Sequence, residues 1–165
     1  MAEASVQKAQ GEFKSPPQVA QDSGGEIEKV VQINRVSKKT AGGNRFRFSA
    51  VVVVGDSQGK VGVGKGSAPD VATAIRKAAN FAKKHQIAVP VKAGTIPHRI
   101  FQKLGAAQVL LKPAPAGSGV IAGGAVRAVV EAAGITSISS KILGTKNKAS
   151  NVYAAFEALK NLQNT

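Results

Sequence analysis

Two strand-like runs joined by a compact turn constrain the fold of this chain more than any other feature of its sequence. From Arg45, aromatic and small side chains alternate with polar ones, and the run then becomes apolar on both faces up to Val54. Such alternation is typical of a strand with one buried and one wet side. The turn GDSQG leads into a second run, Lys60 to Gly66, which we expect to return antiparallel to the first.

Further elements are expected on both sides of this hairpin. A strand-like run from Ile27 to Val36 precedes it, and a helix follows it. For that helix Ser67 is the predicted N-cap, Pro69 a first-turn residue, and Asp70 a complement to the positive helix end. Apolar residues at helical spacing predict its buried face: Val71, Ala74, Ile75, Ala78 and Ala82.

The second half alternates strands and helices in a different order. We expect runs at 98–104, 108–112 and 136–143, a helix at 123–133 that Gly134 stops, and a last helix capped by Ser150. The pattern predicts an α+β protein of two small domains, in each of which helices pack on a sheet. The predicted divisions are a disordered tail at 1–25, a first domain at 26–92 and a second at 93–165.

Positive charge is concentrated in the part that these patterns predict to be folded. The net charge of the whole sequence is +14, yet residues 1–28 hold two lysines against five acidic residues. The remaining 137 residues therefore carry 21 basic and only four acidic side chains, a net charge of +17. A polyanionic partner is the natural inference. The alternative is a basic surface that is merely solvated.

The segment from Arg35 to Phe48 is the strongest candidate for contact with RNA. It surrounds a glycine bend with basic and hydrogen-bonding side chains and contains no acid. Such a hairpin tip can follow a phosphate backbone or enter a groove, whereas a hairpin that is only solvated usually has acids among its bases. The predicted contact residues are Arg35, Ser37, Lys38, Lys39, Thr40, Gly42, Gly43, Asn44, Arg45 and Arg47.

A second candidate is the glycine-rich run GKVGVGKG. It nearly matches a phosphate-binding loop, but Gly66 stands where Ser or Thr must follow Lys65, which disfavours nucleotide hydrolysis. The glycines recur instead with the period of a strand and leave one face of bare backbone. RNA phosphates can approach this face, the following helix can pack on it, and the two interpretations can both hold. We therefore add Lys60, Gly62, Gly64 and Lys65 to the predicted RNA-binding residues.

Other features argue against catalysis and a membrane location. The glycines between Gly117 and Gly134 suit either an anion nest at a helix start or close packing on a sheet. His85 and His98 have no evident acidic partner and the chain has no cysteine, so we predict no catalytic residue, metal or cofactor. No stretch approaches the roughly 18 apolar residues of a membrane span, which predicts a soluble, cytoplasmic protein.

Two long segments resemble the signatures of a known family. GNRFRFSAVVVVGDSQGKVGVGKGSAPDVATAI, residues 43–75, and LLKPAPAGSGVIAGGAVRAVVEAAGI, residues 110–135, are similar, in this order, to the hallmarks of the bacterial-type small-subunit ribosomal protein S5 family. GTKNKASNVYAAFEAL, residues 144–159, is similar to the end of that family. The resemblance covers residues 26–162.

The resemblance implies a first domain like a double-stranded-RNA-binding fold and a second domain of the S5 domain-2 type, a βαβ module. It implies a structural constituent of the small ribosomal subunit that binds 16S rRNA, supports assembly and lines the path by which mRNA enters. The implied partners are 16S rRNA, mRNA and proteins S4, S8 and S3, with translational accuracy influenced together with S4. A free-standing RNA-binding regulator and a nucleotide-dependent enzyme are the alternatives.

Carried over to this chain, the resemblance places residues 37–43 toward the hinge between the head and the body of the subunit. It places the strand region 105–112 against protein S4. The implied interface residues are Gly105, Ala106, Ala107, Gln108, Val109, Leu110 and Lys112. Gln108 departs from the basic residue that many members carry, and the acidic start before Glu26 matches no shared motif.

Overall fold

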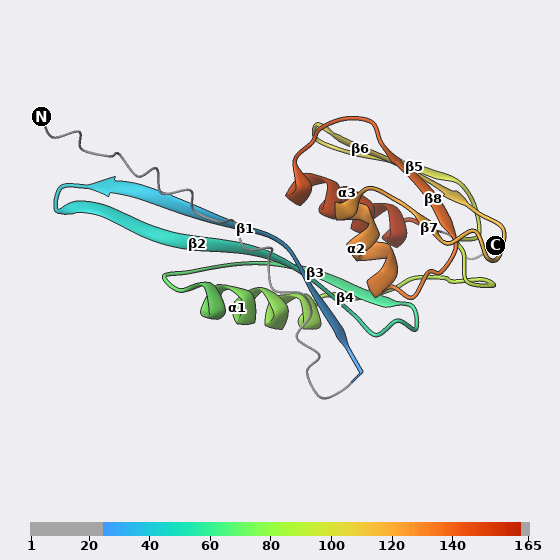
Figure 1. Cartoon of the computed structure of the whole chain (residues 1–165), viewed down its shortest axis with the longest axis horizontal. Coiled ribbons are helices and arrows are strands. Elements are labelled where there is room, and N and C mark those ends of the chain that lie inside the picture. Colours follow the sequence, from blue (N-terminus) through green and yellow to red (C-terminus); the bar gives the residue numbers. More distant parts are fainter. Residues whose placement is uncertain (1–24, 163–165) are drawn as a thin grey trace, which may run out of the picture.

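The computed structural model describes residues 25–162. The predicted tail at 1–25 therefore lies outside the described residues, apart from Gly25. The described part has the predicted α+β architecture (Figure 1). In chain order its elements are β1 (Ile27–Thr40), β2 (Gly43–Gly55), β3 (Lys60–Ala68), α1 (Val71–Lys84), β4 (Gln86–Ala88), β5 (Ile100–Leu104), β6 (Ala107–Pro113), β7 (Val120–Ile121), α2 (Gly124–Ala132), β8 (Ile138–Ile142) and α3 (Lys148–Lys160).

The first sheet has the strand order β1-β2-β3-β4, with every neighbouring pair antiparallel. The predicted hairpin of β2 and β3 is confirmed, with Val53 opposite Val63. β1 continues to Thr40, beyond the predicted end at Val36, because its polar final residues still pair with the start of β2. The short β4 was not predicted.

The helix starts differ from the predicted ones. Ser67 lies in β3, and Asp70 is the N-cap of α1, where its side chain accepts hydrogen bonds from the backbone N–H groups of Ala72 and Thr73. A residue before proline favours extended backbone, so Ala68 stays in the strand and the helix starts only after Pro69. Similarly, Asn147 rather than Ser150 caps α3.

The second sheet has the order β5-β6-β8-β7. β5, β6 and β8 are antiparallel neighbours, whereas β7 runs parallel to β8. β7, α2 and β8 therefore form the expected βαβ unit. Gly134 follows the end of α2 with a φ of +80°, which confirms the predicted glycine stop.

Both faces of the first sheet are buried. Ala50, Val52 and Val54 pack with the alanines of α1, whereas Val51, Val53, Val61 and Val63 join one cluster with buried residues of α2 and α3. These two helices also pack on the second sheet, so the layers run α1, first sheet, α2 with α3, second sheet (Figure 1). The two modules share a hydrophobic core, and the domain boundary after residue 92 stays a prediction.

The β2–β3 turn docks on the end of α2. The backbone N–H groups of Ser57 and Gly59 donate to the carbonyl oxygens of Ala132 and Ala133, each at 3.1 Å. These are helix-terminal carbonyls that lack partners within α2. The side chain of Lys29 on β1 also pairs with Glu131 on α2. The first module therefore caps a helix of the second.

Candidate nucleic-acid interface

A two-stranded ribbon, residues 36–47, projects from the first sheet. β3 ends at Ala68, the partner of Phe48, so beyond Phe48 only β1 and β2 remain paired. The ribbon runs from the pair Val36–Arg47 to the pair Thr40–Gly43. At the usual rise per residue it extends about 15 Å beyond the three-stranded part. Figure 1 shows it reaching away from both modules.

The tip of the ribbon is a tight turn at the predicted glycine bend. Ala41 and Gly42 connect the strands, and Gly43 has a φ of +122°, which favours glycine. The hydroxyl of Thr40 donates to the carbonyl oxygen of Gly43 at 2.7 Å, which closes the turn with a side chain that was predicted to contact RNA. Every side chain from residue 36 to 47 is exposed.

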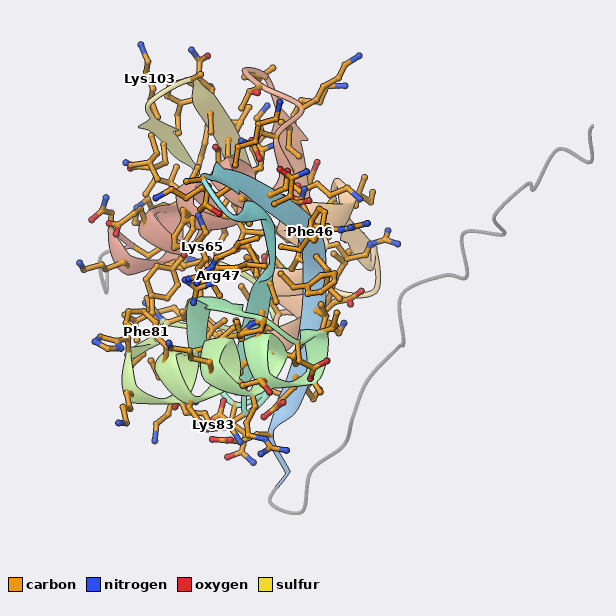
Figure 2. The ribbon with its side chains drawn as sticks, turned by 90° about the vertical axis from the view of Figure 1, so that its left-hand side faces the viewer. Phe46, Arg47, Lys65, Phe81, Lys83 and Lys103 are labelled. Carbon is orange, nitrogen blue, oxygen red and sulfur yellow. The ribbon has the colours of Figure 1, made fainter. Side chains whose placement is uncertain are left out.

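The strand register divides the ribbon into two faces. Residues opposite each other in an antiparallel pair point to the same side, so Lys38, Arg45 and Arg47 share one face with Lys65 of β3. On the other face the guanidinium of Arg35 lies 4.0 Å from the centre of the Phe46 ring. Figure 2 shows Arg47 and Lys65 on one side of the ribbon and Phe46 on the other.

The exposure of Phe46 corrects one sequence expectation. Its alternation with Arg45 and Arg47 predicted a buried side chain, yet 46% of the residue's surface is exposed. The reason is that α1 and β3 stop short of this part of the ribbon. Phe46 belongs instead to an open groove of about 570 Å³. The groove is lined by Val36, Ser37, Lys38, Thr40, Arg45, Phe46, Arg47 and Pro69.

Carboxylates in the described residues are largely engaged away from the ribbon. Glu26 and Glu28 pair with Lys83 at 3.3 and 2.9 Å, and Glu131 pairs with Lys29 and Arg127. Asp70 caps α1. Within residues 25–162 no ion pair involves a side chain of the ribbon, so its positive charge is available to an external anion.

Asp56 stabilises the β2–β3 turn. Its Oδ1 accepts hydrogen bonds from the backbone N–H groups of Gln58 and Lys60, at 2.8 and 2.9 Å. Partial desolvation acts to raise the pKa of Asp56, but these hydrogen bonds and the charge of Lys60 together hold it below its ordinary value of 3.8. This acid therefore positions the turn that caps α2.

The glycine face of β3 belongs to helix packing. A Cβ at Gly62, Gly64 or Gly66 would overlap the carbonyl oxygens of Ala82, Ala78 and Ala74, successive turns of α1. The face is buried beneath α1, which favours the packing alternative, and RNA contact by Gly62 and Gly64 stays a prediction outside the candidate interface. Lys60 and Lys65 are exposed and stay in the candidate interface. The run is also a strand rather than a phosphate-binding loop.

The strand region predicted to face protein S4 contains both buried and exposed residues. In β6, Ala107 and Val109 are fully buried against the helices, which disfavours their direct contact with a protein; their assignment to the interface stays a prediction. Gln108, Leu110 and Lys112 lie on the opposite face of the sheet, and Gly105 and Ala106 form an exposed turn. In β5, Phe101 pairs with Leu110 and Lys103 pairs with Gln108, so both lie on this outer face. The sequence pattern did not predict these two residues, because their position depends on the strand register.

Among residues 25–162 no group of His, Asp and Glu side chains is arranged to hold a metal ion. No helix in this part of the chain has the length and apolar character needed to cross a membrane.

Comparison with known proteins defines the class first: a basic α+β component of the ribosome. The model of the ribosomal protein S5 N-terminal domain matches residues 27–90, and that of the S5 C-terminal domain matches residues 102–165. The small ribosomal subunit protein uS5 of Thermus thermophilus is 49% identical over 136 residues, covering 82% of this chain and 84% of the relative. The chain therefore belongs to the ribosomal protein S5 family.

Proposed function

We propose that this chain is a structural constituent of the small ribosomal subunit and binds 16S rRNA through the ribbon together with Lys60 and Lys65. The observation that carries the proposal is an exposed basic ribbon that projects from the core and has no carboxylate partner within residues 25–162. Membership of a ribosomal protein family supports RNA as the anion.

The two faces of the ribbon suit different parts of an RNA. Lys38, Arg45 and Arg47 offer charged donors to phosphates, and arginine can contact one phosphate with two N–H groups. On the other face the Arg35–Phe46 pair offers a flat cationic surface against which sugars or bases can pack. A narrow ribbon with donors on both sides suits insertion between two RNA segments.

The outer face of the second sheet is the proposed contact with protein S4. Gln108, Leu110 and Lys112 with the exposed turn at Gly105 and Ala106 support this assignment, because within residues 25–162 α2 and α3 pack on the opposite face of the sheet. Contacts with S8, S3 and mRNA, a part in subunit assembly and an influence on accuracy are proposed from the family resemblance. The proposed location is the cytoplasm, on the ribosome, and the role is not catalytic.

The proposal is tested by removing the ribbon without touching the core. Replacing residues 37–46 with Asn-Gly joins Val36 to Arg47 through a favourable two-residue turn, because this pair occupies the same kind of ladder position as Thr40 and Gly43, which the natural two-residue turn joins. We expect the shortened protein to fold as the parent does and to bind 16S rRNA at least tenfold more weakly in filter binding at fixed salt. Unchanged affinity would remove the ribbon from the RNA interface.

A further inference from the structure

Beside its buried face, α1 has an aromatic pair that the ribbon interface does not use. The rings of Phe81 and His85 stack with their centroids 4.1 Å apart and an interplanar angle of 22°. Phe81 is 48% exposed, whereas the buried residues of this helix are all alanines. The pair therefore lies beside the helix packing and not within it.

His85 is held in place at the end of the helix. It is the C-cap of α1, and its Nδ1 lies 2.9 Å from the carbonyl oxygen of Phe81. A carbonyl oxygen can only accept, so Nδ1 carries the hydrogen and the ring is fixed over the last turn. The imidazole is consequently preorganised against the phenyl ring, with its second ring nitrogen directed away from that hydrogen bond.

The surroundings of the pair are strongly basic. Lys77 and Lys84 lie one helical turn before and after Phe81, on the same side of α1. α1 contains no acidic residue. α1 covers the face of the first sheet opposite to that of Lys65, and Figure 2 shows Phe81 on this helix, apart from Arg47 and Lys65. Flat rings flanked by cations fit an unpaired nucleotide, whose base stacks while its phosphates meet the lysines.

We infer that the Phe81–His85 pair is a stacking site for an unpaired RNA base, separate from the ribbon. A base placed on an outer face of the pair extends the stack to three rings. Lys77 and Lys84 then contact the adjoining phosphates. This inference rests on the proposed function, because it takes RNA as the partner, and it adds single-stranded RNA as the class of ligand bound by α1.

The test uses the full chain and two probes: a short single-stranded RNA with one 2-aminopurine, and an RNA duplex of the same length. Phe81→Leu keeps an apolar side chain but removes the ring, Phe81→Tyr keeps the ring, and Phe101→Leu changes an equally exposed phenylalanine elsewhere. For Phe81→Leu we expect about tenfold weaker binding of the single strand and loss of the 2-aminopurine quenching. Duplex binding should not change.

The controls separate the two proposals. Phe81→Tyr and Phe101→Leu should retain both the affinity and the quenching of the parent protein. If the parent binds the single strand and Phe81→Leu does so with equal affinity and quenching, the inference is overturned. If the parent binds neither probe, the proposed RNA-binding function itself fails.

Discussion

At the scale of single residues, the glycines fall into two groups: those whose Cα packs against another part of the backbone, and those with no atom nearby. Gly55 and Gly134 belong to the first group, because an added Cβ would overlap the carbonyl oxygens of Ala132 and Ser57. Gly42 belongs to the second, with no atom near its would-be Cβ. The same residue type is thus required at the contact between modules and replaceable at the ribbon tip.

Gly134→Ala is expected to destabilise the protein by about 3 kcal/mol, because it combines a positive φ with overlap against the β2–β3 turn. Urea unfolding followed by circular dichroism measures the change. Gly42→Ala is the matched control and should alter stability by less than about 0.5 kcal/mol. Equal stabilities for the two variants would contradict the packing described for the turn.

The stabilisation that Asp56 contributes to the folded protein should depend on pH, and the direction follows from its lowered pKa. The pKa of Asp56 is lower in the folded protein than in the unfolded chain. Its carboxylate therefore contributes its full stabilisation when the pH is above the pKa of the unfolded chain, and this contribution is lost as the pH falls through the pKa of the folded protein. Asp56→Ala should therefore be less stable than the parent at neutral pH, by under about 1 kcal/mol at this partly exposed site. Unfolding curves at several pH values should show the difference shrinking in acid.

Single residues were predictable from the sequence where the cause of their conformation is local. Ala74, Ala78 and Ala82 on the buried face of α1 were predictable from their spacing, whereas Val71 and Ile75 are only half-buried and Ala79 was missed. The stop at Gly134 was predictable from the conformation that a helix end requires. The N-cap of α1 was not, because two residues, Ser67 and Asp70, are plausible caps and Pro69 decides between them. Gly62 and Gly64 could not be assigned because the pattern shows a bare face without showing which partner covers it.

At the scale of elements, the ribbon differs from the rest of β1 and β2 only in lacking a third strand and a helix. Its alternating pattern continues unchanged from the core outward, so the sequence predicted strands but not where burial ends. Phe46 and Phe48 read alike in the sequence, yet only Phe48 lies where β3 still pairs with β2. Whether each phenylalanine is exposed therefore depends on which elements lie beside it and not on its own strand pattern.

Replacing Lys38, Lys39 and Arg45 together with alanine should weaken RNA binding and flatten its salt dependence. Each lost phosphate contact removes a released counterion, so the slope of log K against log salt should fall by up to about 2 to 3. Titrations at several salt concentrations measure it. The control changes Lys146, Lys148 and Lys160, three exposed lysines near or on α3; an equal fall in both variants would refute a specific ribbon interface.

At the scale of the whole molecule, the two modules are joined by a common core rather than by a linker alone. The run Val51–Val54, apolar on both sides, was the sequence signal that the first sheet is covered twice. The second face packs on α2 and α3, which follow more than seventy residues later in the chain. The periodicity of a strand does not reveal such a distant partner. The number of modules was predictable, but their mutual packing was not.

Val53→Ala should therefore weaken both modules at once. Val53 is fully buried in the cluster that includes α2 and α3, and its truncation should cost about 2 kcal/mol. Hydrogen exchange should show faster exchange of slow amides in β2 and β6 together. Val36→Ala, on the exposed ribbon, is the control. Loss of protection confined to the first sheet would show that the modules unfold independently.

The most direct test of the central claim is sedimentation of the tagged chain in a bacterial lysate, before and after magnesium is lowered to separate the ribosomal subunits. We predict that the parent protein migrates with the small subunit in both conditions. The shortened ribbon variant should join that particle less completely, because its RNA contacts are reduced. Migration of the parent protein away from every ribosomal particle would contradict a role as a structural constituent of the small subunit.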